Sequence, residues 1–60
     1  MRKDPTLHRY LGNRWGVAPE AVKKWMVARE IDKITDLMRF SHDHTEAMDK
    51  ALTDFWGFST

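Results

Sequence analysis

The chain has 60 residues, with ten Lys or Arg, nine Asp or Glu, a net charge of +1 and no cysteine. This length allows one small domain with a modest core, so a partner subunit would add stability. The absence of cysteine excludes a disulfide-stapled scaffold and thiolate chemistry. No apolar run has the length of a membrane span and no signal-peptide core follows the first residues, so we expect a cytoplasmic protein.

The charge is unevenly distributed along the chain. Residues 1–30 hold seven basic and three acidic residues, a net charge of +4, whereas residues 31–60 hold three basic and six acidic residues, a net charge of −3. This distribution is typical of a module that places one face on phosphates and turns the other away. Because charge clusters are usually solvated faces, the asymmetry is supporting evidence only.

The first helix is predicted over residues 5–15. Asp4 supplies an N-cap acceptor and Pro5 fits the first helical position. Arg9 and Asn13 are expected to face water or a partner, and Tyr10 to lie beside the buried stripe. That stripe consists of apolar residues spaced four apart: Leu7, Leu11 and Trp15.

A tight turn is predicted next. Gly16 stands where a helix ends in the left-handed conformation, Val17 follows as an apolar plug, and Gly12 leaves room for a second helix backbone. Pro19 then begins a helix that extends to about Ala28. Its apolar face comprises Val22, Trp25 and Met26. Its opposite face comprises Glu20, Lys23, Lys24 and Val27.

This pattern resembles the helix-turn-helix of the Cro and phage-repressor family, over residues 7–28 only. The family positions are filled by Leu11, Gly12, Trp15, Gly16, Val17, Val22 and Trp25. The resemblance implies a DNA-binding protein of a bacterial or phage-infected cell, whose second helix enters the major groove. An ordinary helical hairpin with a glycine cap is the alternative interpretation.

Site residues follow from the resemblance. The base contacts it implies come from the exposed start of the second helix: Ala18, Pro19, Glu20 and Lys23. Lys23 would donate to guanine and Glu20 would accept from cytosine N4. The phosphate contacts would come from the basic residues nearby: Arg9, Arg14, Lys24 and Arg29.

Three departures from the family pattern favour other interpretations. Ala18 stands where the family usually has a capping Ser or Thr, Glu20 places an anion on the helix that would meet DNA, and the initial helix of the family is missing. These features favour a small protein-binding helical module, such as a phage-encoded inhibitor of a host protein. A third interpretation is the DNA-recognition module of a phage packaging or recombination assembly.

A third helix is predicted over residues 33–40. If the second helix continued without a break, Ile34 and Met38 would lie on the opposite side from Val22 and Trp25. A break near 29–32 is therefore the simpler interpretation. Asp32 would then be the N-cap of the third helix. The core face of this helix comprises Ile34, Leu37 and Met38.

The last helix is predicted over residues 43–56, ending at Gly57. Ser41, Asp43 or Thr45 would cap it, and Glu46 would place an acid in its first turn. Its apolar stripe comprises Ala47, Met48, Ala51, Leu52, Phe55 and Trp56.

The end of this helix carries an aromatic tail, which consists of Phe55, Trp56 and Phe58. The aromatic tail either folds back over Trp15 and Trp25 or forms a dimer contact, and we favour the dimer. The predicted dimer or partner contact comprises Met48, Leu52, Phe55, Trp56 and Phe58.

Catalytic and metal chemistry are not indicated. His42 and His44 flank Asp43, but this spacing turns the two rings apart and no third ligand is within sequence reach. No nucleophile turn, glycine-rich phosphate loop or carboxylate pair is recognisable. We therefore expect a non-enzyme without a cofactor.

The sequence as a whole predicts an all-α protein. We expect a dimeric bundle of about four short helices in a single domain over 1–60, with the helix-turn-helix at 5–28 and a packing and dimerisation part at 32–58. Its expected function is sequence-specific DNA-binding transcription regulation. In the alternative, the acidic last helix and aromatic tail bind a protein partner.

Overall fold

The computed structural model describes residues 6–59. They form helices α1 (Leu7–Trp15), α2 (Pro19–Arg29) and α3 (His44–Ser59), with a 3-10 helix, η1 (Ile34–Arg39), between α2 and α3. Residues 6–59 contain no strand. The predicted all-α class with about four short helices is confirmed. The predicted start of the first helix at Asp4 and Pro5 lies outside the described residues.

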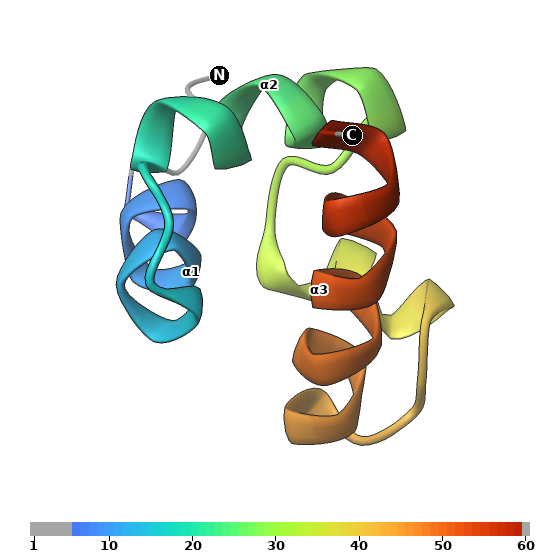
Figure 1. The fold of residues 1–60 in the computed structure, drawn as a ribbon. Helices are drawn as coiled ribbons and strands as arrows, with labels where there is room; N and C mark the ends of the chain where they lie inside the picture. Colours follow the sequence, from blue (N-terminus) through green and yellow to red (C-terminus); the bar gives the residue numbers. More distant parts are fainter. Residues whose placement is uncertain (1–5, 60) are drawn as a thin grey trace.

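The helices enclose one core. In Figure 1, α1 and α3 lie on opposite sides of the molecule, and α2 runs across one end of both, with η1 near α3. This arrangement leaves one face of α2 on the outside, while its other face closes the core. The buried core residues are Leu7, Leu11, Val22, Trp25, Met26, Ile31, Leu37, Ala47, Met48, Ala51 and Phe55.

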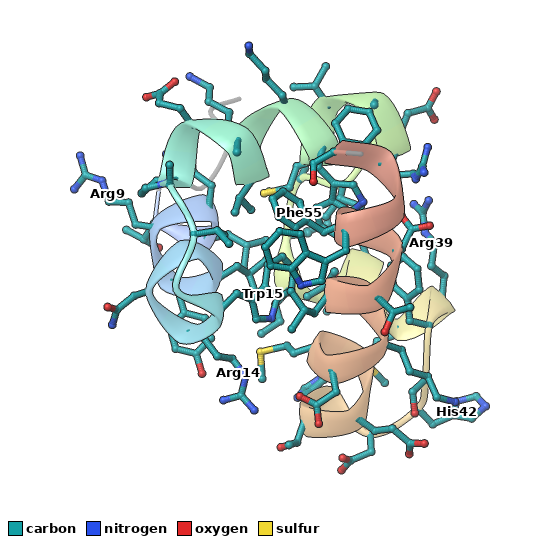
Figure 2. All side chains as sticks on the ribbon, in the orientation of Figure 1. Arg9, Arg14, Trp15, Arg39, His42 and Phe55 are labelled. Carbon is teal, nitrogen blue, oxygen red and sulfur yellow. The ribbon has the colours of Figure 1, made fainter. Side chains whose placement is uncertain are left out.

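An aromatic cluster fills the centre of this core. Trp25 is fully buried, and its ring centroid lies 5.7 Å from that of Trp15 and 6.2 Å from those of Phe40 and Phe55. Edge-to-face pairs at such distances stabilise a core beyond the apolar area that they bury. Trp15 and Phe55 therefore join α1 to α3 through their side chains (Figure 2), although the two helices lie apart.

The aromatic tail corrects one prediction. Phe55 and Met48 were predicted in a dimer or partner contact, but both are buried in the chain's own core. Phe55 folds back over Trp15 and Trp25, which is the alternative that the sequence left open. The remaining predicted contact residues are accessible to different extents: Leu52 is half-buried, and Trp56 and Phe58 are exposed.

The ends of α3 show one prediction confirmed and one wrong. Asp43 accepts a hydrogen bond from the Glu46 backbone N–H at 2.9 Å, so it is the N-cap among the three candidates. Gly57 does not end the helix, which extends to Ser59. Because Gly57 does not have a positive φ, it provides no left-handed C-cap.

Other side chains also differ from the prediction. Tyr10 was expected beside the buried stripe of α1, but it is 50% exposed. Ile34 was expected in the core and is exposed, whereas Leu37 is buried and Met38 half-buried. A 3-10 helix aligns side chains three apart and rotates those four apart by about 120°, so it separates Met38 from Ile34, but it does not explain why Ile34 is exposed while Leu37 is buried.

The start of η1 corrects a capping prediction. Asp32 was expected as the N-cap, but the Asp36 carboxylate accepts the backbone N–H groups of Asp32 and Lys33 at 2.7 and 3.1 Å. These backbone hydrogen bonds lower the pKa of Asp36 below its ordinary value. The cap therefore comes from inside η1 and reaches backwards along the chain.

The predicted break after α2 is confirmed, and Glu30 produces it. Glu30 has φ 59° and ψ 47°, the left-handed conformation that glycine adopts most easily. The Glu30 N–H donates to the Val27 carbonyl, and the Ile31 N–H donates to the Met26 carbonyl at 2.8 Å. This pattern is a Schellman motif, and the two residues between which an apolar contact often accompanies it, Met26 and Ile31, both belong to the buried core.

Glu30→Gly is expected to stabilise the protein by about 1 kcal/mol, because a non-glycine residue in the left-handed region costs roughly 1–2 kcal/mol. Glu30→Ala is the matched control, since it removes the same carboxylate but keeps the Cβ. Urea unfolding of both variants checks this. Equal free energies of unfolding for the two variants would contradict the left-handed cap.

Candidate nucleic-acid interface

The turn between α1 and α2 depends on two glycines. Gly16 has φ 71° and ψ 32°, and the N–H groups of Gly16 and Val17 both donate to the Gly12 carbonyl. The chain then runs back past α1, so that a Cβ on Gly12 would lie 2.9 Å from the Val17 carbonyl oxygen. The same Cβ would lie 3.3 Å from the backbone of Pro19. Both predicted glycine roles are confirmed.

This geometry places α2 firmly against α1. Pro19 occupies the first turn of α2, and Ala18 makes no side-chain cap, as the sequence indicates. Val22, Trp25 and Met26 are buried, which confirms the predicted apolar face. Two helices joined by a three-residue turn, with the second helix exposed along its outer side, are common to a helix-turn-helix and to an ordinary helical hairpin.

The outward face of α2 has a mixed composition. At 3.6 residues per turn, its members fall within an arc of about 100° opposite Trp25. They are Glu20, Lys23, Lys24 and Val27, and all four are exposed. Ala18 and Pro19 are exposed at the start of the same helix. Thus the four predicted base contacts, Ala18, Pro19, Glu20 and Lys23, lie together at one end of α2.

Arg9 and Asn13 border this end of α2 from α1. Both side chains are exposed, and they line an open, shallow depression together with the backbone of the turn. The other lining residues are Gly12, Gly16, Val17, Ala18 and Pro19. Figure 2 shows the Arg9 guanidinium extending away from the core at this edge. Asn13 was not among the predicted site residues, but its spacing of four from Arg9 was a signal that could have identified it.

The cations of α1 and α2 fall into two groups. Arg9, Lys23 and Lys24 form no ion pair within residues 6–59. Arg14 and Arg29, two of the predicted phosphate contacts, have intrachain partners on α3: Arg14 lies 3.8 Å from Asp49, and Arg29 lies 2.7 Å from Asp54. Among the cations of α1 and α2, those without an ion pair in the described part of the chain are therefore Arg9, Lys23 and Lys24.

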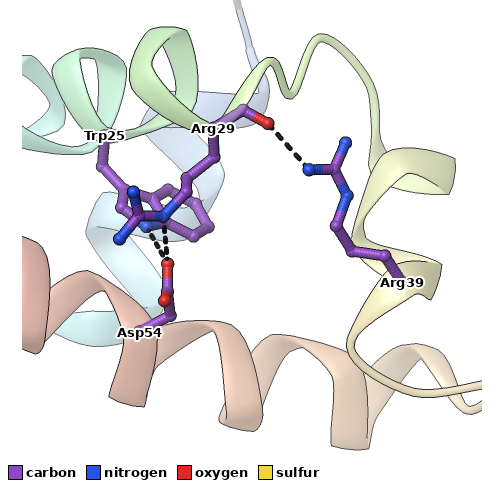
Figure 3. Close-up of polar contacts among 4 residues, drawn as sticks. All are labelled: Trp25, Arg29, Arg39 and Asp54. Carbon is purple, nitrogen blue, oxygen red and sulfur yellow. Dashed lines mark hydrogen bonds and ion pairs between the residues drawn. The ribbon is translucent and has the colours of Figure 1, made fainter.

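Asp54 joins α3 to the inner side of α2. Its Oδ2 atom accepts one hydrogen bond from Arg29 Nε and one from Trp25 Nε1, both at 2.7 Å (Figure 3). Arg29 also lies 5.5 Å from the centre of the Phe58 ring. The hydrogen bonds from Arg29 and Trp25 lower the pKa of Asp54 below its ordinary value of 3.8. This cluster fixes the rotation of α2 and thus the direction of its outward face.

Arg39 supports the same end of α2. Its Nη1 donates to the Arg29 carbonyl at 2.8 Å, as Figure 3 shows, and its Nη2 lies 3.4 Å from the Glu30 carbonyl oxygen. A cation at a helix C-terminus satisfies free carbonyl groups and opposes the negative end of the helix dipole.

Asp54→Asn is expected to lower the free energy of unfolding by about 1 kcal/mol at pH 7, since hydrogen bonds to a charged group contribute more than neutral ones and this group is partly exposed. The pKa of Asp54 is lower in the folded state than its unfolded value of 3.8. The ionised carboxylate therefore stabilises the folded protein above pH 3.8, and this stabilisation is lost as the pH falls through the pKa of the folded state. Urea unfolding of wild type and variant at pH 7 and near pH 2.5 tests this. A difference that does not shrink at low pH would contradict the ionic role.

The described residues also bear on two other features, metal sites and membrane spans. Residues 6–59 contain no group of three or more His, Asp or Glu side chains that could hold a metal ion. None of the helices in this range has both the length and the apolar character needed to cross a membrane. Comparison with family models, curated proteins and solved structures gives no match.

Proposed function

We propose that the protein binds double-stranded DNA and regulates transcription, with α2 placed in the major groove. The observation that carries the proposal is the outward face of α2, which bears Lys23 and Lys24 and lies beside Arg9, three cations that form no ion pair within residues 6–59. An α-helix fits the major groove of B-form DNA, and free cations at its border supply the phosphate contacts.

The roles of individual residues follow from their positions. Arg9 and Lys24 contact phosphates on either side of the groove, because their long side chains extend from α1 and from the flank of α2. Lys23 donates to guanine O6 or N7. Glu20 accepts a hydrogen bond from cytosine N4. Because acceptor groups on other base edges repel its carboxylate, this contact makes binding specific for cytosine. The Arg29–Asp54 pair positions α2 rather than contacting DNA.

A titration with a random-sequence duplex, followed by backbone amide NMR, tests the location of this interface. The largest shift changes are expected at residues 9–13 and 18–27, around the turn and the outward face of α2. The amides of Asp43 and Glu46, on the acidic start of α3, serve as internal controls and should not move. Shift changes concentrated on α3 would contradict the proposed interface.

We also propose a dimer, because two copies would place two recognition helices on one face of the DNA about 34 Å apart. Trp56 and Phe58 at the end of α3 support this proposal, since 51% of Trp56 and 38% of Phe58 are exposed. The same aromatic pair favours the second candidate function, binding of a protein partner. Light scattering with and without duplex separates a dimeric DNA-binding protein from a monomeric protein-binding module.

A further inference from the structure

Val27 is an apolar side chain in the middle of a polar helix face. It is 57% exposed, more than any other large apolar residue of the described chain. At 3.6 residues per turn it falls about 20° from Glu20, with Lys23 and Lys24 on either side. No core contact holds it in place, so the fold itself does not explain an apolar residue at this position.

We infer that Val27 contacts the C5-methyl group of a thymine, an inference that rests on the proposed DNA binding. Thymine is the base that presents an apolar group in the major groove, so a branched aliphatic side chain on a groove-facing helix has one matching partner there. Lys23 and Lys24 lie one turn earlier and have no ion pair among the described residues, so they bring this part of α2 close to the duplex.

The spacing along α2 makes the inference specific. Val27 lies seven residues after Glu20, which corresponds to about 10 Å along the helix axis at 1.5 Å per residue. Because the two side chains lie at separate points along the groove, the recognised site contains a thymine a few base pairs from the cytosine that Glu20 contacts.

The experiment uses duplexes enriched from a random pool by the full chain. Each thymine of an enriched site is replaced in turn by deoxyuridine, which lacks only the C5-methyl group, and the Kd is measured for wild type and Val27→Ala. With wild type, one replacement is expected to weaken binding about fourfold, as for the burial of one methyl group. With Val27→Ala, that replacement should have no effect.

Ile34→Ala is the matched control, because Ile34 is an exposed aliphatic residue on η1, outside α2. It should keep the fourfold preference for thymine. Alanine at position 27 should preserve α2, since alanine has the highest helix propensity. A thymine preference that persists in Val27→Ala, or is absent from wild type, would overturn the role of Val27 alone. Failure of wild type to bind any duplex would overturn the proposed function as well.

Discussion

Replacing Gly12 with valine is expected to lower the free energy of unfolding by roughly 3 kcal/mol, and thus the Tm by roughly 12 °C or more. The reason is the backbone contact at the turn: a Cβ at this position would lie 2.9 Å from the Val17 carbonyl oxygen. The opposing atoms belong to the backbone of the turn and of Pro19, so no side chain can rotate away. Gly12→Ala should destabilise by less, because alanine improves helix propensity by about 1 kcal/mol.

Gly57→Ala is the matched control for this series. Gly57 also lies inside a helix, but a Cβ there would meet nothing within 4 Å. The same substitution is therefore expected to stabilise the protein by about 0.5–1 kcal/mol. Thermal unfolding followed by circular dichroism measures both effects. A Gly12→Val variant as stable as wild type would contradict the close approach of α2 to α1.

The double substitution Arg9→Ala/Lys24→Ala is expected to make DNA binding less dependent on salt. If each residue neutralises one phosphate, the slope of log K against log salt concentration becomes less negative by about 2. At 0.1 M salt, relative to 1 M, this corresponds to a loss of affinity of roughly 60-fold, and the loss should be similar for all sequences. Mobility-shift titrations at four salt concentrations measure the slope.

Lys33→Ala/Lys50→Ala is the control for net charge. It removes the same two positive charges, but from η1's N-terminal side and from α3. Its slope should equal that of wild type. If the slope of log K against log salt concentration changed equally in both double variants, overall charge, rather than Arg9 and Lys24, would determine binding.

The local features of this fold were predictable from the sequence where single residues carry strong conformational preferences. Gly16 and Pro19 define the turn between α1 and α2, and Gly12 indicates a close approach of two backbones. The outward face of α2 followed from helical periodicity alone. For the same reason, the four residues expected to contact bases do lie together at one end of α2.

The remaining features depend on contacts between distant parts of the chain. Helical phase predicted a break near 29–32, but Glu30 ends α2 in a left-handed conformation that its residue type disfavours, so the exact residue at the break could not be predicted locally. The hydrogen bond between Arg29 and Asp54 joins residues 25 apart, and no local pattern indicates it. Likewise, Phe55 and Trp56 are neighbours of similar character, and only tertiary packing determines that Phe55 is the buried one.

We propose that Arg9 and Lys24, which form no ion pair within residues 6–59, bind the phosphates of DNA. The most direct test is a titration of wild-type protein on a random-sequence duplex at 50 and 200 mM salt. If Arg9 and Lys24 each neutralise one phosphate, we expect the affinity to fall about 12-fold between the two conditions. No binding at 50 mM salt, or binding that is equally strong at 200 mM, would contradict the claim.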